Sequence, residues 1–150
     1  MKFEFSAGGI VYKYQKSKIK SQKDEILILV CQHSQHHGWV FPKGLIGDKE
    51  DNRYQTKEET AVREVKEETG IDGEIEAEIK PTSYFYVWDN EKIKKTVYYF
   101  IMKFKGGDTN DHDDEMEDVM WIDYNQVSEK LTYASEKEAW EEAKELIANG

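Results

Sequence analysis

Hydrophobic and polar residues alternate through much of the chain before residue 110, and this pattern predicts strands. The predicted strands comprise residues 3–14, 25–31, 74–88 and 92–105, with a further strand around residues 119–122. Residues 15–24 are polar and rich in lysine, which indicates an exposed hairpin tip between the first two strands. Asp89 and Asn90 mark the turn between the third and fourth strands. We therefore expect a sheet to form the centre of the fold.

Two segments have signals typical of helices. Thr56 and Glu59 have the spacing of a capping box, so the first helix is predicted to begin at Thr56. Gly70 is placed to end this helix as a left-handed cap. Residues 129–149 form the second predicted helix, with apolar residues at Leu131, Ala134, Ala139, Trp140, Ala143, Leu146 and Ile147. The chain of 150 residues has no internal repeat and no linker that would divide it, which predicts a single domain over residues 1–150.

The composition restricts the partners of this domain. The formal net charge is -10, which argues against duplex nucleic acid as a partner, because binding a long polyanion requires a basic surface. A small phosphorylated substrate that arrives with its metal ion is compatible with this charge. No segment has the length and apolar character of a signal peptide or a membrane span, so we expect a cytoplasmic protein without a membrane partner. The only cysteine, Cys31, follows an apolar run and is predicted to be a buried strand residue rather than a nucleophile.

An acidic cluster within residues 63–71 is the most informative feature of the chain. On a helix, Glu64, Glu67 and Glu68 fall on one arc, where like charges repel one another. Such a cluster is stable on an open solvated face, or where oxygen ligands bind a hard divalent cation. Ala61, Val62 and Val65 form an adjoining apolar stripe that would dock the helix against the rest of the domain. The residues alone leave both the solvated face and the metal site open.

A second motif precedes this helix. Residues 38–44 join a short apolar strand to a turn with Pro and Gly that places Lys43. The two motifs together resemble the Nudix hydrolases, whose signature has a Gly, a Glu six positions later, and a helical segment that matches residues 63–71 throughout. Gly44 and Glu50 match the first part, but twelve residues separate Glu50 from Arg63 where the family has seven. The five extra residues fall within residues 51–55 and are expected to lengthen the loop, at little cost in closure entropy.

The resemblance implies an α+β fold, a Nudix-type α/β/α sandwich with a mixed central sheet. It also implies that Glu64, Glu67 and Glu68 hold Mg²⁺, with Mn²⁺ as an alternative, and that Glu67 and Glu68 count among the catalytic residues. Arg63 would orient one of these glutamates, because a guanidinium can hold a carboxylate through two hydrogen bonds. An exposed Arg–Glu pair on the helix is the alternative interpretation of Arg63.

The general base is assigned to Glu115, which lies six residues before Trp121. Many relatives in the family have a glutamate at this place, in a loop over the metal site. A solvated acidic loop is the competing interpretation, because Asp113, Asp114 and Glu117 are close in sequence.

Three residues are candidates for substrate binding. Lys43 and Lys95 are placed to meet phosphate groups, although an ordinary exposed lysine is an equal interpretation of Lys43. The aromatic residues among 98–100 alternate on a predicted strand, and such residues are more often part of the core. Tyr133 lies in a loop before a helix and is therefore the better candidate for stacking on a base. The segments around Lys95 and Tyr133 resemble the diadenosine polyphosphate hydrolase branch of the family.

The sequence thus predicts a metal-dependent pyrophosphohydrolase of a small nucleotide, in first place a diadenosine polyphosphate such as diadenosine tetraphosphate. Water would attack a phosphoanhydride bond. One alternative is another Nudix pyrophosphatase, acting on ADP-ribose, a nucleoside triphosphate or an RNA 5′ end. Another is a non-catalytic module that binds a nucleotide, although such modules normally lose the glutamates that are present in this chain.

Three histidines, His33, His36 and His37, lie close together just before Gly38. Histidines at this density can bind a transition metal. No fourth ligand is apparent, so we interpret them as surface loop residues near the substrate.

Overall fold

The fold is built on one long pair of strands. In the computed structural model, which describes residues 1–47 and 54–150, β1 (Lys2–Gln15) lies parallel to β7 (Glu91–Gly107). The pairing runs from Lys2 opposite Ile93 to Tyr12 opposite Lys103. The remaining strand pairs are antiparallel, so the sheet is mixed.

The described residues form a sheet of eight strands around this pair. On one side, β1 pairs with β4 (Lys43–Leu45) and then with β2 (Glu25–His33), which itself pairs with β3 (Trp39–Val40) and β8 (Met116–Asp123). On the other side, β5 (Ile71–Glu78) and β6 (Thr82–Trp88) follow one another along β7. The hairpin tip between β1 and β2 is exposed, as predicted.

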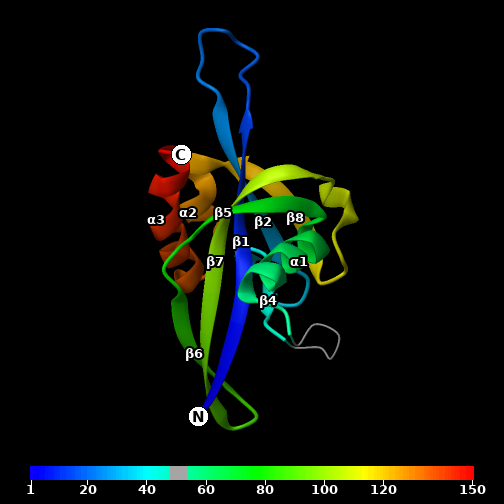
Figure 1. The fold of residues 1–150 in the computed structure, drawn as a ribbon, viewed down its shortest axis with the longest axis vertical. Coiled ribbons are helices and arrows are strands. Elements are labelled where there is room, and N and C mark those ends of the chain that lie inside the picture. The colour runs from blue at the N-terminus through cyan, green and yellow to red at the C-terminus, as the bar shows by residue number, and fades with distance from the viewer. Residues whose placement is uncertain (48–53) are drawn as a thin grey trace.

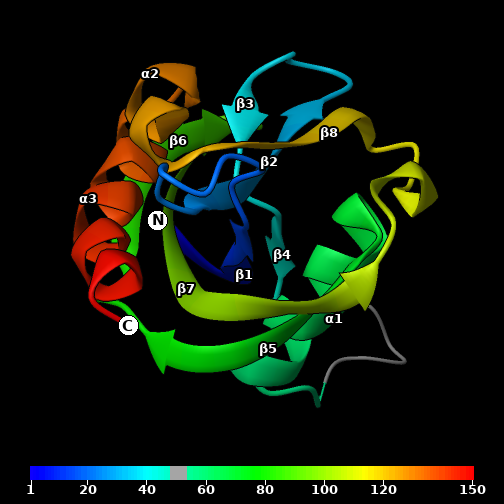
Figure 2. The ribbon, with the colours of Figure 1, turned by 90° about the horizontal axis from the view of Figure 1, so that it is seen from above.

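Helices cover the two faces of this sheet (Figures 1 and 2). The helix α1 (Lys57–Thr69) packs on one face, and α2 (Val127–Lys130) and α3 (Ala134–Ala148) lie on the other. One apolar cluster joins the sheet to α1 through Ala61 and Val65, and a second joins it to α3 through Trp140 and Ile147. Short 3₁₀ helices, Thr109–Asp111 and Tyr124–Gln126, flank β8. This layering is the predicted α+β sandwich with a mixed central sheet.

Local signals determine where α1 begins and ends. Thr56 accepts a hydrogen bond from the Glu59 backbone, and the Glu59 side chain accepts one from the Thr56 backbone, which is the predicted capping box. Gly70 has a φ of 78°, in the left-handed region, and its N–H donates to the Lys66 carbonyl. Only glycine adopts that conformation at little cost, so the helix ends where the sequence places it.

Two predicted elements are interrupted in the structure. The strand predicted over residues 74–88 is wrong in its middle, because β5 ends at Glu78 and β6 begins at Thr82. Pro81 lies in the gap and has no N–H to donate to the ladder, while the Ile79 N–H still bonds the Tyr99 carbonyl. The turn after β6 is correct, since Asp89 and Asn90 both have positive φ, at 51° and 60°.

The terminal helix predicted over residues 129–149 is also divided. Leu131 has an extended backbone after α2, and α3 begins only at Ala134. The physical reason is a contact that lies far away in the sequence. The Thr132 N–H donates to the Trp39 carbonyl, and the Thr132 hydroxyl accepts from the Trp39 N–H, so the segment pairs with β3 instead of coiling. None of the helices within residues 1–47 and 54–150 is long and apolar enough to cross a membrane.

Candidate functional site

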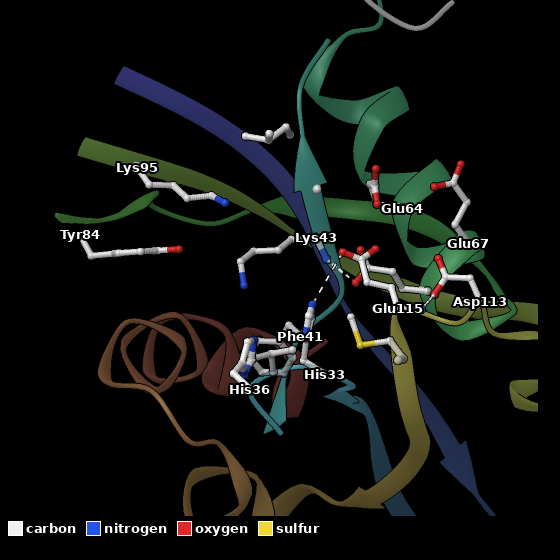
Figure 3. Close-up of a pocket in the computed structure, with 15 residues that line it drawn as sticks. His33, His36, Phe41, Lys43, Glu64, Glu67, Tyr84, Lys95, Asp113 and Glu115 are labelled. Carbon is white, nitrogen blue, oxygen red and sulfur yellow. Dashed lines mark hydrogen bonds and ion pairs between the residues drawn. The ribbon is translucent and has the colours of Figure 1, made fainter. Parts of the chain in front are cut away.

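The acidic cluster of α1 faces a cavity of about 550 Å³ (Figure 3). Glu64 and Glu68 are buried, with 6 % and 2 % of their surface exposed, whereas the Glu67 side chain is 42 % exposed. The cavity lies between α1, the segment that contains β3 and β4, and the loop before β8. Its lining comprises His33, His36, Val40, Phe41, Lys43, Gly44, Leu45, Glu64, Glu67, Glu68, Tyr84, Lys95, Asp113, Glu115 and Met116.

Burial changes the protonation of two of these glutamates. Burial is the main cause that raises the pKa of both Glu64 and Glu68, and the rise is large for Glu68. The side chains hydrogen-bond to each other, which raises the pKa of Glu68 further and lowers that of Glu64. The charge of Glu115 also raises the pKa of Glu68. Without a cation, the pair therefore favours a shared proton over two neighbouring charges.

The donor set fits a hard divalent cation. Within the part of the chain that the structure describes, no group of three or more His, Cys, Asp or Glu side chains is already arranged around a metal position. The oxygens of Glu64, Glu67 and Glu68 nevertheless line one cavity, and oxygen is the ligand that Mg²⁺ and Mn²⁺ prefer. The backbone leaves room for them, because a Cβ on Gly44 would lie 2.1 Å from the Glu64 carboxyl carbon. A bound cation would replace the proton that the buried pair otherwise holds.

Arg63 holds two of the glutamates from the side. Its Nη1 donates to Glu64 Oε1 at 2.9 Å and to the Glu67 carboxylate at 3.1 Å, and its Nε donates to Gln55 Oε1 at 2.9 Å. The Arg63 side chain is therefore a partner of the cluster rather than a solvated surface group. The role predicted for Arg63 is to orient a glutamate of the cluster. Such a role requires this geometry.

Glu115 lines the same cavity from the loop before β8, and Figure 3 shows it beside Asp113 near the glutamates of α1. Its N–H donates to Asp113 Oδ1 at 3.1 Å, and its carbonyl accepts from the Ser34 N–H at 2.9 Å. The Asp113 N–H in turn donates to the Glu67 carbonyl at 2.9 Å, which ties this loop to α1. Asp113 lines the cavity as well, and burial raises the pKa of its carboxyl. The tertiary structure thus brings Glu115 to the three glutamates of α1 from more than 40 positions away.

The histidine-rich stretch contributes two residues to the cavity. The His33 ring stacks on the His36 ring at 4.3 Å between centroids, and His33 Nε2 lies 3.7 Å from Glu115 Oε1. His37 points away and contacts Glu117. These three side chains do not converge on one point, which disfavours a transition-metal site. His36 and His37 lie in the loop as predicted, whereas His33 is the last residue of β2 and its side chain is only 17 % exposed.

Lys43 lines the cavity, but its ammonium is already paired. Its Nζ lies 2.7 Å from Glu136 Oε1, and Glu136 on α3 is only 2 % exposed. Burial lowers the pKa of Lys43, but the charge of Glu136 outweighs this effect and the pKa lies well above its usual value. Glu136 also accepts from the Phe41 N–H at 2.7 Å and from the Tyr99 hydroxyl at 3.1 Å.

Sequence reasoning missed Glu136. Glu136 could have been recognised as a buried residue from its position on the apolar face of α3, at helical spacing from Ala139, Trp140 and Ala143. A glutamate on a buried face requires partners, and the sequence does not say which residues these are.

A second cavity of about 500 Å³ adjoins the first. Both are lined by His36, Val40, Lys43, Tyr84 and Lys95, and the second adds Tyr86, Tyr133, Ala134, Ser135 and Glu136. Burial lowers the pKa of Lys95, and among the described residues its ammonium has no carboxylate partner. Figure 3 shows Lys95 and Tyr84 on the side of the cavity away from Glu64 and Glu67.

Tyr133 stands at the rim of this second cavity. Its hydroxyl lies 2.8 Å from His36 Nδ1, and the two rings meet edge to face at 5.4 Å between centroids. Tyr84 was missed in the sequence, where it is one of several tyrosines on a predicted strand. It enters the site because β6 pairs with β7 so that Tyr84 lies opposite Lys95.

Two predictions about single residues have different outcomes. Cys31 is fully buried on β2 and burial raises the pKa of its thiol, so it is a core residue as predicted. Glu50, the match to the first glutamate of the family signature, lies outside the described residues together with positions 51–53 of the expected insertion.

Comparison with known proteins assigns the family. Residues 18–149 match the family described as "NUDIX domain", and the chain belongs to this family. A curated relative from Mycobacterium tuberculosis, named "Putative mutator protein MutT4", is 36 % identical in an alignment 147 residues long that covers 96 % of this chain. The chain spans only 56 % of the length of that relative.

Solved structures show the same fold at low sequence identity. A Caenorhabditis elegans Ap4A hydrolase binary complex superposes with a TM-score of 0.72 at 20 % identity, covering 98 % of this chain and 99 % of that one. The NUDIX domain of Shewanella oneidensis NrtR, complexed with ADP ribose, gives a TM-score of 0.65 at 16 % identity, covering 95 % and 87 %. The predicted family and fold class are therefore confirmed.

Proposed function

We propose that this chain is a Mg²⁺-dependent pyrophosphohydrolase whose substrate is a small dinucleotide of the diadenosine polyphosphate class. The observation that carries the proposal is the division of the two adjoining cavities. Carboxylates of Glu64, Glu67, Glu68 and Glu115 line one end. Tyrosines line the other end, together with Lys95, which has no carboxylate partner among residues 1–47 and 54–150. A substrate with a polyphosphate chain and a nucleoside at its end matches both ends at once.

The carboxylate end supplies the machinery for water attack. Glu64, Glu67 and Glu68 would hold Mg²⁺ or Mn²⁺, which when bound polarises a phosphoryl oxygen and lowers the pKa of water. Glu115, which lines the same cavity, would take a proton from the attacking water. Arg63 keeps the Glu64 and Glu67 carboxylates in their orientation through hydrogen bonds of 2.9 and 3.1 Å.

The other end supplies recognition. The Lys95 ammonium is half-buried and has no carboxylate partner in the part of the chain that the structure describes, so a phosphate group would relieve the cost of its desolvation. Tyr133 is 39 % exposed at the cavity rim, and a base stacked on such a ring gains about 1–3 kcal/mol in nucleic-acid systems. The structural similarity to the Ap4A hydrolase supports this substrate class through the fold alone.

A nucleoside triphosphate or ADP-ribose is the second candidate substrate. The sequence relative named as a mutator protein favours a MutT-type nucleotide, and the NrtR domain is a relative in fold that was solved with ADP ribose. Either compound would use the same carboxylates and would differ in how it occupies the second cavity. A sensor without catalysis is disfavoured, because all three glutamates of α1 are present and face the cavity.

The test is product release from a panel of nucleotides, each with Mg²⁺ and with EDTA. The panel contains diadenosine tetraphosphate, ADP-ribose, the nucleoside triphosphates and a 5′-triphosphorylated RNA. We expect metal-dependent cleavage of the dinucleotide to ATP and AMP, with a raised KM in Lys95→Met and Tyr133→Ala and little change in kcat. A preference for another compound would be consistent with the proposed metal site but would reject the dinucleotide as the substrate. Absence of turnover across the panel from folded protein would contradict the enzymatic proposal.

A further inference from the structure

Glu136 is a buried carboxylate that the chemistry described above does not use. It belongs to α3, on the opposite face of the sheet from the metal-binding glutamates of α1 (Figure 2). We propose that Glu136 is a positioning residue: it holds the Lys43 ammonium at the junction of the two cavities and keeps residues 41–44 against the carboxylates of α1. This inference rests on the proposed function, because the role it assigns is in the same reaction.

Three donors converge on Glu136 from two elements. Oε1 accepts from Lys43 Nζ at 2.7 Å and from the Tyr99 hydroxyl at 3.1 Å, and Oε2 accepts from the Phe41 N–H at 2.7 Å. Both oxygens are therefore occupied, and the side chain is almost without solvent. A fully satisfied carboxylate of this kind holds its partners in one arrangement.

The segment that Glu136 holds also reaches the predicted metal ligands. The Lys43 N–H donates to Glu68 Oε1 at 3.3 Å, and Gly44 lies directly against the Glu64 carboxyl. The Pro42 carbonyl, between the two contacts with Glu136, accepts from the Gly9 N–H at 3.1 Å on β1. Residues 41–44 thus lie between Glu136 on one side and Glu64 with Glu68 on the other. A movement of Glu136 would change the place of both α1 carboxylates.

The presence of an ion pair at this buried position is explained by a role in the reaction rather than by a contribution to the stability of the fold. A buried salt bridge is commonly no more stabilising than apolar residues of the same volume. The surrounding cluster, with Phe41, Tyr99 and Trp140, is apolar, but the Phe41 N–H and the Tyr99 hydroxyl would both lose their acceptor on such a replacement. Lys43 lines both cavities, so the pair keeps a charged nitrogen at the cavity wall, where an apolar pair would leave none. Glu136 also separates the roles of the two lysines, since it neutralises Lys43, whereas no carboxylate among the described residues pairs with Lys95.

The first test does not require turnover. The Lys43 N–H bonds Glu68 and not Glu136. Its hydrogen-exchange rate therefore reports whether residues 41–44 transmit a change at Glu136 to Glu68. We expect Glu136→Ala to accelerate this exchange at least about tenfold while the Ile79 N–H, bonded to the Tyr99 carbonyl, keeps its rate. The matched control is Glu138→Gln, an exposed glutamate of the same helix, which should change neither rate. An unchanged Lys43 rate in Glu136→Ala would overturn the proposal.

The second test separates positioning from stability by steady-state kinetics with the preferred nucleotide. We expect Glu136→Gln to lower kcat about tenfold or more with KM within about twofold, and Glu136→Asp to recover part of the loss. The double variant Lys43→Met with Glu136→Gln removes both charges and keeps a side-chain oxygen that can accept from the Phe41 N–H, so it should be more stable to heat than Glu136→Gln alone while its kcat stays low. Recovery of both stability and kcat in the double variant would show that the pair serves the fold only. If the wild type has no turnover, the proposed function fails and the exchange experiment still decides the coupling.

Discussion

Three glutamates on one arc of α1 have different surroundings, and this difference matters more than their shared spacing. Glu64 and Glu68 are buried and hydrogen-bonded to each other, so a proton is favoured on the pair. Glu67 is exposed to the cavity and is held by Arg63 at 3.1 Å. Glu67 is therefore the member of the cluster that meets a cation as a charged carboxylate at least cost in desolvation.

Replacement of Glu67 by Gln tests the metal site at the scale of one residue. The amide keeps the shape of the side chain and removes its charge, so Mg²⁺-dependent turnover should fall by about 100-fold or more. Such a loss is larger than is usual for a residue that only hydrogen-bonds to a metal ligand. The free energy of unfolding should change by less than about 0.5 kcal/mol, because the Glu67 side chain is exposed. Steady-state kinetics and urea unfolding measure the two quantities, with Glu138→Gln as the control. Near-normal turnover in the folded Glu67→Gln protein would reject α1 as the metal site.

At the scale of elements, the site depends on how closely α1 approaches the segment between β3 and β4. Gly44 on β4 faces Glu64 on α1 so closely that a methyl group has no space between them. The β4 strand is fixed in turn by its pairing with β1, where Ala7 lies opposite Gly44. The carboxylates are thus positioned by an inter-element contact whose geometry requires a residue without a side chain.

Replacement of Gly44 by Ala should damage the site more than the fold. The new Cβ would lie 2.1 Å from the Glu64 carboxyl carbon, which is the far end of a flexible side chain and can move away. We expect a cost of about 1–3 kcal/mol in unfolding free energy, as for overpacking, and at least about tenfold weaker Mg²⁺ activation. Denaturant unfolding and a Mg²⁺ titration of activity measure these effects. An unchanged Mg²⁺ dependence would show that the Glu64 carboxylate is not required where the structure places it.

At the scale of the whole molecule, the site draws on both faces of the sheet. The predicted metal ligands come from α1, Glu136 and Tyr133 come from α3 and its N-terminal boundary, and the strands β6 and β7 contribute Tyr84 and Lys95. Because burying Glu68 opposes its ionisation, the stability of the molecule is linked to pH and to metal.

The sign of this linkage is fixed by the direction of the shift. The pKa of Glu68 is raised in the folded state above its ordinary value of 4.5, so the folded state retains a proton that the unfolded state loses. Stability contributed by Glu68 is therefore lost as pH rises from about 4.5 through the raised pKa. The slope for one proton is at most about 1.4 kcal/mol per pH unit. Thermal unfolding in EDTA should show this loss in the wild type relative to Glu68→Gln.

Metal should reverse the effect. In the proposed site Mg²⁺ would bind the ionised carboxylates, so its stabilisation of the wild type should grow with pH and be reduced in Glu68→Gln. A wild-type stability that tracks that of Glu68→Gln at every pH, with and without Mg²⁺, would contradict the assignment of Glu68 as a ligand.

Features with short-range causes could be read from the sequence. The bounds of α1 follow from the Thr56–Glu59 capping box and from Gly70. The hairpin turn at Asp89 and Asn90 follows from residues that tolerate positive φ. The helix over residues 129–149 and the strand over residues 74–88 were wrong in part, because a distant pairing with Trp39 divides the first and the proline at position 81 interrupts the second.

By itself, the sequence determined the family, the strand pattern and the placement of Glu64, Glu67 and Glu68 on one helix, since backbone geometry fixes which neighbouring side chains share a face. Only the tertiary structure decided which of these carboxylates is exposed, that Lys43 is paired, and that Lys95 has no carboxylate partner within residues 1–47 and 54–150. Glu136 contacts Lys43 across 93 positions of the chain, and Glu68 contacts the Lys43 backbone across 25. Such contacts are created by the packing of helices on opposite faces of a sheet, and desolvation there sets the charge of each group.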